Sequence, residues 1–148
     1  MSVHRNEHAV EIAAPPAAVF PWLVASEERC RWMGALVESE PLDDGPPAVG
    51  SRFRDVFEDL GRRVELEAEV VELEPPRLLA VHLVSDVFEA TSTSRLEPAG
   101  GGTRLHAEIA TTYTALAARL LAPAVTHHAQ KRLEGDLARL KELVEARS

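Results

Sequence analysis

Residues 115–146, ALAARLLAPAVTHHAQKRLEGDLARLKELVEA, form the one stretch that is long and periodic enough to predict a long helix. Its apolar residues recur at intervals of four, three and four and so share one stripe of a helix: Leu133, Leu137, Leu140 and Val144. Toward the N-terminus the same stripe becomes polar, at Gln130 and Thr126. We therefore expect the C-terminal half to seal a core and the N-terminal half to face a cavity. Pro123 should kink or restart this helix, and Thr114 is a candidate cap.

The length and composition indicate one domain, residues 1–148, large enough to bury its own core. No apolar run approaches the length of a membrane span, and the N-terminus has no apolar signal region. Cys30 is the single cysteine, which excludes an internal disulfide and is compatible with a reducing cytoplasm. These features predict a cytoplasmic protein without an integral membrane segment.

The charge of the chain is −8 and is unevenly distributed. Residues 1–114 carry ten arginines and twenty carboxylates, whereas residues 115–148 carry six basic and four acidic side chains. An acidic body repels phosphate, so nucleic acid is not an expected partner. The asymmetry is that of a basic helix lying across an acidic sheet.

The chain before the helix reads mainly as strands. Residues 8–12 alternate as a half-buried strand, Pro15-Pro16 opens a short helix, and Ser26 is the expected N-cap of a second short helix that ends at Gly34. Six further strands are predicted, over residues 35–40, 50–59, 64–70, 79–83, 88–97 and 105–111. In the clearest of them the glutamates should face solvent and the apolar residues the core, with a bulge allowed after Ala68: Glu65, Glu67 and Glu69 against Val64, Leu66, Ala68 and Val70.

Consecutive strands joined by tight turns pair antiparallel, and only the terminal helix is long enough to cover the apolar face of the resulting sheet. The predicted fold class is therefore α+β, with a curved antiparallel sheet of about seven strands around the C-terminal helix and two short helices after the first strand.

Five phrases in this order resemble the START-like (SRPBCC, helix-grip) superfamily. They are VEIAAPPAAVF at 10–20, Trp32, GSRF at 50–53, EPPRLL at 74–79, and LEP at 96–98 followed by GTR at 102–104. The resemblance spans nearly the whole chain and points to the polyketide cyclase/dehydrase and lipid-transport branch. It implies a helix-grip domain and a hydrophobic ligand. The superfamily includes carriers, cyclases, hormone receptors and co-chaperones, and these phrases are scaffold that assigns no catalytic residue.

Asp55 is the foremost candidate for chemistry. The alternation that turns Phe53 and Phe57 inward turns Asp55 inward too, as a general base or an acceptor for a ligand hydroxyl would require. The other interpretation is a residue near the sheet edge, wetted or paired with an arginine such as Arg31. Because no second group is evident to position it as a base, Asp55→Asn is expected to leave the protein folded and to change ligand affinity modestly.

Two further signals are polar. Ser92 and Ser94 face inward in the middle of a strand and suit either a cavity or close helix packing. His127 flanks the polar stripe, whereas the adjacent His128 points about 100° away. His127 with Asp55 would supply two ligands where a metal site needs three or four, so no metal and no cofactor are expected.

The sequence thus predicts binding of a small hydrophobic or amphipathic ligand, such as a lipid, isoprenoid, quinone or polyketide-like compound, between sheet and helix. The alternatives are an aromatic cyclase/dehydrase with Asp55 or His127 as base, and a protein-binding module of the co-chaperone kind. Whether the chain is a monomer or a dimer stays open. The predicted ligand-binding residues are Phe53, Asp55, Leu66, Val81, Phe88, Ser92, Ser94, Ile109, Thr126, His127 and Gln130, with Val64 and Leu79 as further walls.

Overall fold

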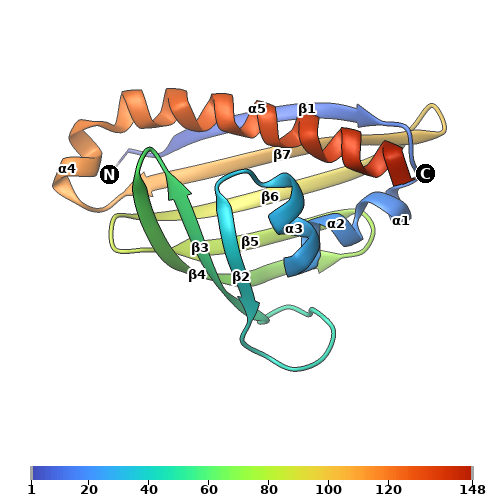
Figure 1. Ribbon diagram of the computed structural model, residues 1–148, viewed down its shortest axis with the longest axis horizontal. Coiled ribbons are helices and arrows are strands. Elements are labelled where there is room, and N and C mark those ends of the chain that lie inside the picture. The colour runs from blue at the N-terminus through green and yellow to red at the C-terminus, as the bar shows by residue number, and fades with distance from the viewer. Residues whose placement is uncertain (1, 148) are drawn as a thin grey trace.

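The computed structural model describes residues 2–147 and shows one seven-stranded antiparallel sheet with helices on one side (Figure 1). The strand order is β1-β7-β6-β5-β4-β3-β2, so consecutive strands from β2 to β7 are neighbours and β1 closes onto β7. The strands are β1 His4–Ile12, β2 Leu36–Pro41, β3 Arg52–Asp59, β4 Arg62–Glu74, β5 Leu78–Val84, β6 Phe88–Ala99 and β7 Gly102–Tyr113. The helices are α1 Pro16–Val19, α2 Pro21–Val24, α3 Ser26–Trp32, α4 Leu116–Leu120 and α5 Ala122–Arg147. The predicted fold class is confirmed.

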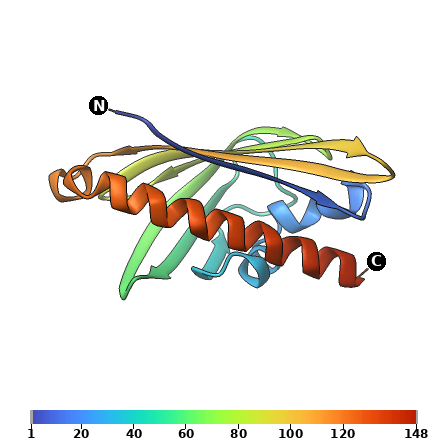
Figure 2. The ribbon, with the colours of Figure 1, turned by 90° about the horizontal axis from the view of Figure 1, so that it is seen from above.

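The sheet bends around α5. Figure 2 shows α5 running along the sheet, with β3 and β4 turning away from β6 and β7 beneath it. The predicted apolar stripe of α5 is buried throughout, at Leu133, Leu137, Leu140 and Val144. No helix of residues 2–147 is both long and apolar enough to cross a bilayer.

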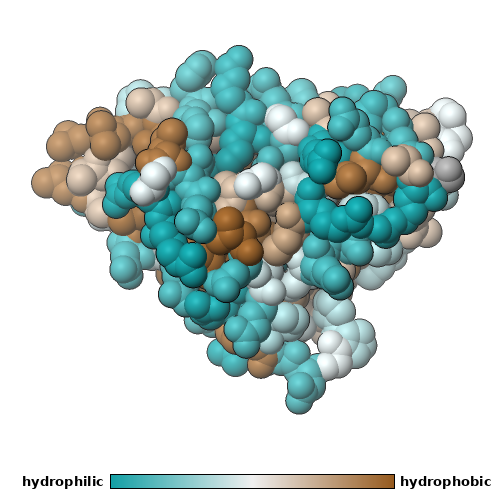
Figure 3. Space-filling view, in the orientation of Figure 1, coloured by the Kyte–Doolittle hydropathy of each residue, from teal (hydrophilic) through white to brown (hydrophobic). Residues whose placement is uncertain are grey.

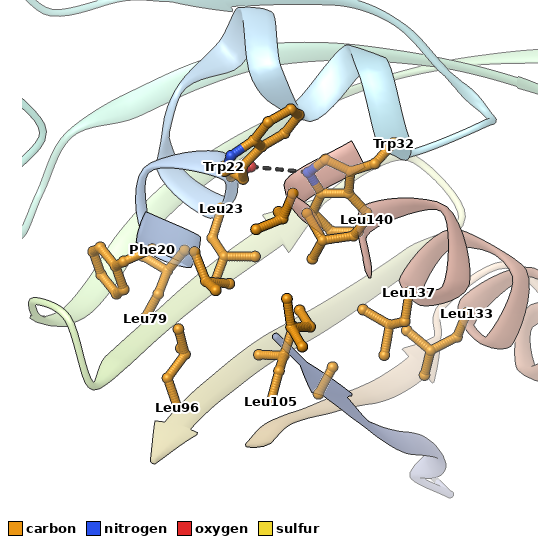
Figure 4. Packing of buried hydrophobic residues seen from close by; sticks show 14 of the residues in the cluster. Phe20, Trp22, Leu23, Trp32, Leu79, Leu96, Leu105, Leu133, Leu137 and Leu140 are labelled. Carbon is orange, nitrogen blue, oxygen red and sulfur yellow. Dashed lines mark hydrogen bonds between the residues drawn. The ribbon is translucent and has the colours of Figure 1, made fainter. Parts of the chain in front are cut away.

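The core lies between the stripe of α5, the sheet and the short helices (Figure 4). Leu105 of β7 and Leu140 of α5 are fully buried, and Trp22 of α2 and Trp32 of α3 belong to the same buried cluster. The indole Nε1–H of Trp32 donates to the backbone carbonyl of Trp22 at 2.9 Å, so the one polar atom of this buried side chain is satisfied. This bond ties α2 to α3.

The predicted faces of β4 are confirmed for most of the strand. Glu65, Glu67 and Glu69 are exposed, and three of the four apolar residues, Leu66, Ala68 and Val70, are buried while Val64 is half-buried. The bulge lies between Val70 and Glu72, so the parity holds through Val70.

The helix starts differ from the prediction at three positions and agree with it at a fourth. Ser26 is not the N-cap of α3, which begins at Ser26 after Ala25; its hydroxyl instead forms a hydrogen bond with the hydroxyl of Ser39 at 3.0 Å. Thr114 does not cap the next helix either, because α4 begins at Leu116 and its N-cap is Ala115. The first predicted short helix is two single turns, α1 and α2, because Pro21 has no N–H to continue the first. The predicted restart at Pro123 is confirmed, since α4 ends before α5 begins at Ala122.

Candidate functional site

A cavity of about 90 Å³ lies between the short helices and the bent part of the sheet. One wall comes from α2 and α3 and the opposite wall from the inward rows of β3, β4, β5 and β6, with Pro47 of the β2–β3 loop at its edge. The lining residues are mostly apolar: Leu23, Val24, Trp32, Met33, Pro47, Phe53, Phe57, Ala68, Val70, Leu79, Val81 and Leu83, with Arg29, Ser92 and Ser94 as the polar members.

Arg29 reaches this cavity from α3 and is held by a buried ion pair. Its Nη2 lies 2.7 Å from Asp55 Oδ2, and its Nη1 lies 3.4 Å from Asp55 Oδ1 and 3.2 Å from Ser39 Oγ. Ser39 Oγ also donates to Asp55 Oδ1 at 2.7 Å. The Asp55 side chain is 0% exposed and that of Arg29 only 12%, so the pair is shielded from solvent and its geometry is bidentate.

Asp55 therefore faces inward, as the alternation of β3 predicts, but its partner is Arg29 and not Arg31. Residues two apart on a helix point about 200° away from each other, so only one of the two arginines of α3 can face the sheet. Arg31 instead lies over the Trp22 ring, 5.2 Å from its centroid, and 3.5 Å from Glu28. Arg29 lies three residues before Trp32 and so shares its helix face, which was the available signal for its inward position.

The structure brings five of the predicted binding and wall residues to the cavity: Phe53, Leu79, Val81, Ser92 and Ser94. Asp55 lies behind Arg29 and does not line the cavity. Leu66 belongs to the buried core, and Phe88 and Ile109 are half-buried against that core without lining the cavity. A ligand-binding role for these three apolar residues stays a prediction.

The polar stripe at the start of α5 joins the helix to β1. Asn6 Nδ2 donates to the backbone carbonyl of Thr126 at 3.0 Å and to Gln130 Oε1 at 3.1 Å, and Gln130 Nε2 donates to the carbonyl of Glu7 at 3.0 Å. Neither Thr126 nor Gln130 lines the cavity. Asn6 is buried and lies in the inward row of β1, two residues before His8, so the alternation of that strand was the signal that identifies it.

His127 is exposed and does not line the cavity, so the structure does not bring it to Asp55. The cavity wall opposite the sheet is built from α2 and α3, where the sequence predicted the N-terminal half of α5. Among residues 2–147 no three His, Cys, Asp or Glu side chains are grouped to hold a metal ion.

A second polar contact holds α5 to the tip of the β3–β4 hairpin. His128 Nε2 lies 2.9 Å from Asp59 Oδ2, and Arg132 Nη1 donates to the same oxygen. Partial burial of Asp59 opposes its ionisation, but the hydrogen bonds from His128 and Arg132 and the charge of Arg132 together hold the pKa of that carboxyl below its ordinary value. The ionised form of Asp59 is thus favoured by the fold.

This contact predicts a loss of stability in acid. Because the pKa of Asp59 is lowered on folding, its contribution is complete above the unfolded value of 3.8 and is lost as the pH falls through the lower folded value. At neutral pH, Asp59→Asn should lower the free energy of unfolding by about 1 kcal/mol, and this difference from the wild type should shrink below pH 3.8. Urea unfolding of the wild type and the variant at a series of pH values measures this difference in the free energy of unfolding. Asp44→Asn, in an exposed loop, is the control, and a difference that stays constant into acid would contradict the assignment.

The bent antiparallel sheet, the long C-terminal helix packed on it and the cavity beside them define a helix-grip protein of the START-like class. The chain matches the Polyketide cyclase / dehydrase and lipid transport family over residues 3–145, and it belongs to that family. None of the curated proteins matches its sequence.

Solved structures show the same fold. A START superfamily protein from Mycobacterium smegmatis is 19% identical, with a TM-score of 0.83 over 98% of this chain and 99% of that one. The ZhuI aromatase/cyclase from Streptomyces sp. R1128 is 18% identical, with a TM-score of 0.82 over 99% of this chain and 96% of that one. The protein TTHA0849 from Thermus thermophilus is 23% identical, with a TM-score of 0.80 over 97% of this chain and 99% of that one. At these identities the likeness shows the fold alone.

Proposed function

We propose that this protein binds a small amphipathic molecule in the cavity between α3 and the sheet, and that Arg29 holds a carbonyl or carboxylate oxygen of that molecule. The proposal rests on one observation, that two N–H donors of Arg29 have no acceptor within the described part of the chain. A guanidinium has five N–H donors, and Asp55 and Ser39 take three of them. The Nε–H and one Nη2–H have no acceptor among residues 2–147, and the side chain lines the cavity.

The rest of the wall suits the apolar body of such a molecule. Apolar side chains make up most of the lining, and the hydroxyls of Ser92 and Ser94 offer two further polar contacts opposite α3. Lipids, isoprenoids, quinones and polyketide-like compounds combine an apolar body with oxygen atoms and fall within this description. Sites for molecules of that size measure about 300–1,000 Å³, so the cavity has to widen when the ligand enters. The exposed β2–β3 loop, which carries Pro47 at the cavity edge, is the segment we expect to move.

The lining favours binding over acid–base catalysis. Arg29 is its only titratable side chain, and a guanidinium keeps its proton at neutral pH and cannot act as a base. Asp55 is fully engaged by Arg29 and Ser39 and lies behind the wall. A cyclase that used Asp55 as its base would first have to break the buried ion pair, which makes the carrier the better-supported proposal.

A comparison of decanoate with decan-1-ol tests the polar half of the proposal. The two molecules share a chain, but only decanoate offers a charged acceptor to Arg29. Hydrogen bonds to charged groups contribute about 1.5–3 kcal/mol, so decanoate should bind at least about tenfold more tightly. Trp32 lines the cavity, and its fluorescence follows the titration. Equal affinities, or no saturable change with either probe, would contradict the assignment of Arg29.

A matched pair of variants tests the location. Ser92→Phe places a large ring in the cavity and should abolish decanoate binding. Thr93→Phe changes the next residue of β6, whose side chain lies on the opposite face of the sheet, and should leave binding unchanged. Binding that survives Ser92→Phe would show that the ligand lies elsewhere.

A further inference from the structure

A cluster of leucines lies exposed at one extremity of the molecule. Leu116 and Leu120 of α4 and the adjoining Leu121 are 67%, 75% and 57% exposed, and α4 has no buried residue at all. Figure 3 shows this cluster as the hydrophobic region at the left, over the position of α4 in Figure 1. Because α4 adds nothing to the core, the fold gives these leucines no internal role, and a protruding group of this kind marks a contact surface.

A small hollow of about 100 Å³ lies at the base of the same helix, lined by Ser2, His4, Tyr113 and Arg119. Tyr113 is only 8% exposed as a residue, but its hydroxyl reaches the hollow and has no hydrogen-bond partner among residues 2–147. Arg119 forms no ion pair with any described residue, and no carboxylate lines the hollow. A free hydroxyl, an imidazole and an unpaired guanidinium around one hollow form a site for an oxyanion.

We propose that this end of the molecule docks on the surface of a lipid bilayer that contains anionic phospholipids. Leu116, Leu120 and Leu121 enter the apolar layer, and the phosphate of an anionic lipid, which has no neighbouring ammonium group to oppose Arg119, occupies the hollow. A phospholipid interface has an apolar layer and a phosphate layer. The exposed leucines thus match the apolar layer, and the hollow beside Arg119 matches the phosphate layer.

Shape and charge favour a bilayer over other occupants. The leucines project from the protein rather than line a groove, so a helix or peptide of a partner finds no complementary cleft, whereas acyl chains rearrange around a protrusion. A second copy of this chain would bring each Arg119 close to its equivalent across a twofold axis, which like charges oppose. Residues 1–114 carry a strong acidic excess, whereas residues 115–130, which include α4 and the start of α5, carry Arg119 and no carboxylate, so this segment is suited to an anionic surface.

The test is co-sedimentation with vesicles of phosphatidylcholine alone or of phosphatidylcholine and phosphatidylglycerol in equal parts. The wild type should bind the mixed vesicles more tightly. Leu120→Ser should weaken binding to them about tenfold, since a leucine side chain contributes about 1.5–3 kcal/mol when it leaves water. Arg119→Gln should weaken it about fivefold on mixed vesicles and leave binding to phosphatidylcholine unchanged.

Matched controls lie away from this end. Val49→Ser removes an equally exposed apolar side chain from the β2–β3 loop, and Arg104→Gln removes an exposed arginine from β7; both should bind like the wild type. No binding by the wild type, or equal binding to both kinds of vesicle, would overturn the proposal. So would a wild-type dimer that Leu120→Ser converts to a monomer without any vesicle binding.

The proposal of membrane docking and the proposal of ligand binding in the cavity can be contradicted independently of each other. None of the residues around α4 lines the cavity, so Leu120→Ser should bind decanoate normally, and Ser92→Phe should still bind vesicles.

Discussion

Leu137→Ala should lower the free energy of unfolding by about 2–5 kcal/mol, the range that large-to-small substitutions in well-packed cores produce. Leu137 is 1% exposed and lies on the α5 stripe between Leu133 and Leu140, facing the sheet. Its truncation leaves a void that a helix held on both sides cannot close, because α5 is also fixed by Gln130 to β1 and by Arg132 to the β3–β4 hairpin. Urea unfolding with an unchanged m-value measures the loss.

The control for this substitution is Leu120→Ala. It removes the same atoms from a neighbouring helix where the side chain is 75% exposed, and it should change the free energy of unfolding by less than about 0.5 kcal/mol. A Leu137→Ala value as small as that of the control would mean that α5 is not the helix on which the sheet packs.

The fold was predictable because its main elements follow local periodicity. The spacing of Leu133, Leu137 and Leu140 predicts a helix face, and the glutamate row of β4 predicts a sheet face. Neither prediction requires knowledge of tertiary contacts. Six consecutive strands, β2 to β7, joined by turns and loops and not by helical crossovers, leave few alternatives to an antiparallel sheet covered by the one long helix. The helix starts were less predictable. Ser26 and Thr114 have the chemistry of caps, but each helix starts one residue away from the position that they would need: Ser26 is already inside α3, and Thr114 precedes the N-cap Ala115 of α4.

The candidate site was only partly predictable, because it depends on which helix covers which part of the sheet. The strand positions Phe53, Val81, Ser92 and Ser94 followed from alternation and do line the cavity. The opposite wall depends on the docking of α3, which rests on tertiary bonds: that of Trp32 to the carbonyl of Trp22, and those of Arg29 to Asp55 and Ser39. Periodicity within α3 narrows the choice between Arg29 and Arg31 only once that docking is known.

Asp55→Asn should lower the free energy of unfolding by about 3–5 kcal/mol, because it removes one partner of a buried ion pair and leaves the other charge uncompensated. The structure thus replaces the expectation, drawn from the sequence, that this substitution leaves the protein folded with little change. Asp55 is 0% exposed and accepts from Arg29 Nη2 at 2.7 Å. An asparagine of the same shape offers one oxygen in place of two and no charge, so Arg29 would lose its bidentate contact and its countercharge at a fully buried position.

A nearby pair supplies the control. Arg54 precedes Asp55 on β3, faces the other side of the sheet and pairs with Glu65 in the open. Glu65→Gln should therefore cost no more than about 1 kcal/mol.

The double variant Asp55→Leu with Arg29→Met separates the ion pair from the packing. Since apolar residues of similar volume can replace a buried pair at little cost, it should be markedly more stable than Asp55→Asn. If that double variant recovers stability but no longer distinguishes decanoate from decan-1-ol, then Asp55 stabilises the fold only by neutralising Arg29, and Arg29 is present for the ligand. If the double variant keeps the preference for decanoate, Arg29 is a structural residue, and the polar contact to the ligand must come from Ser92 and Ser94.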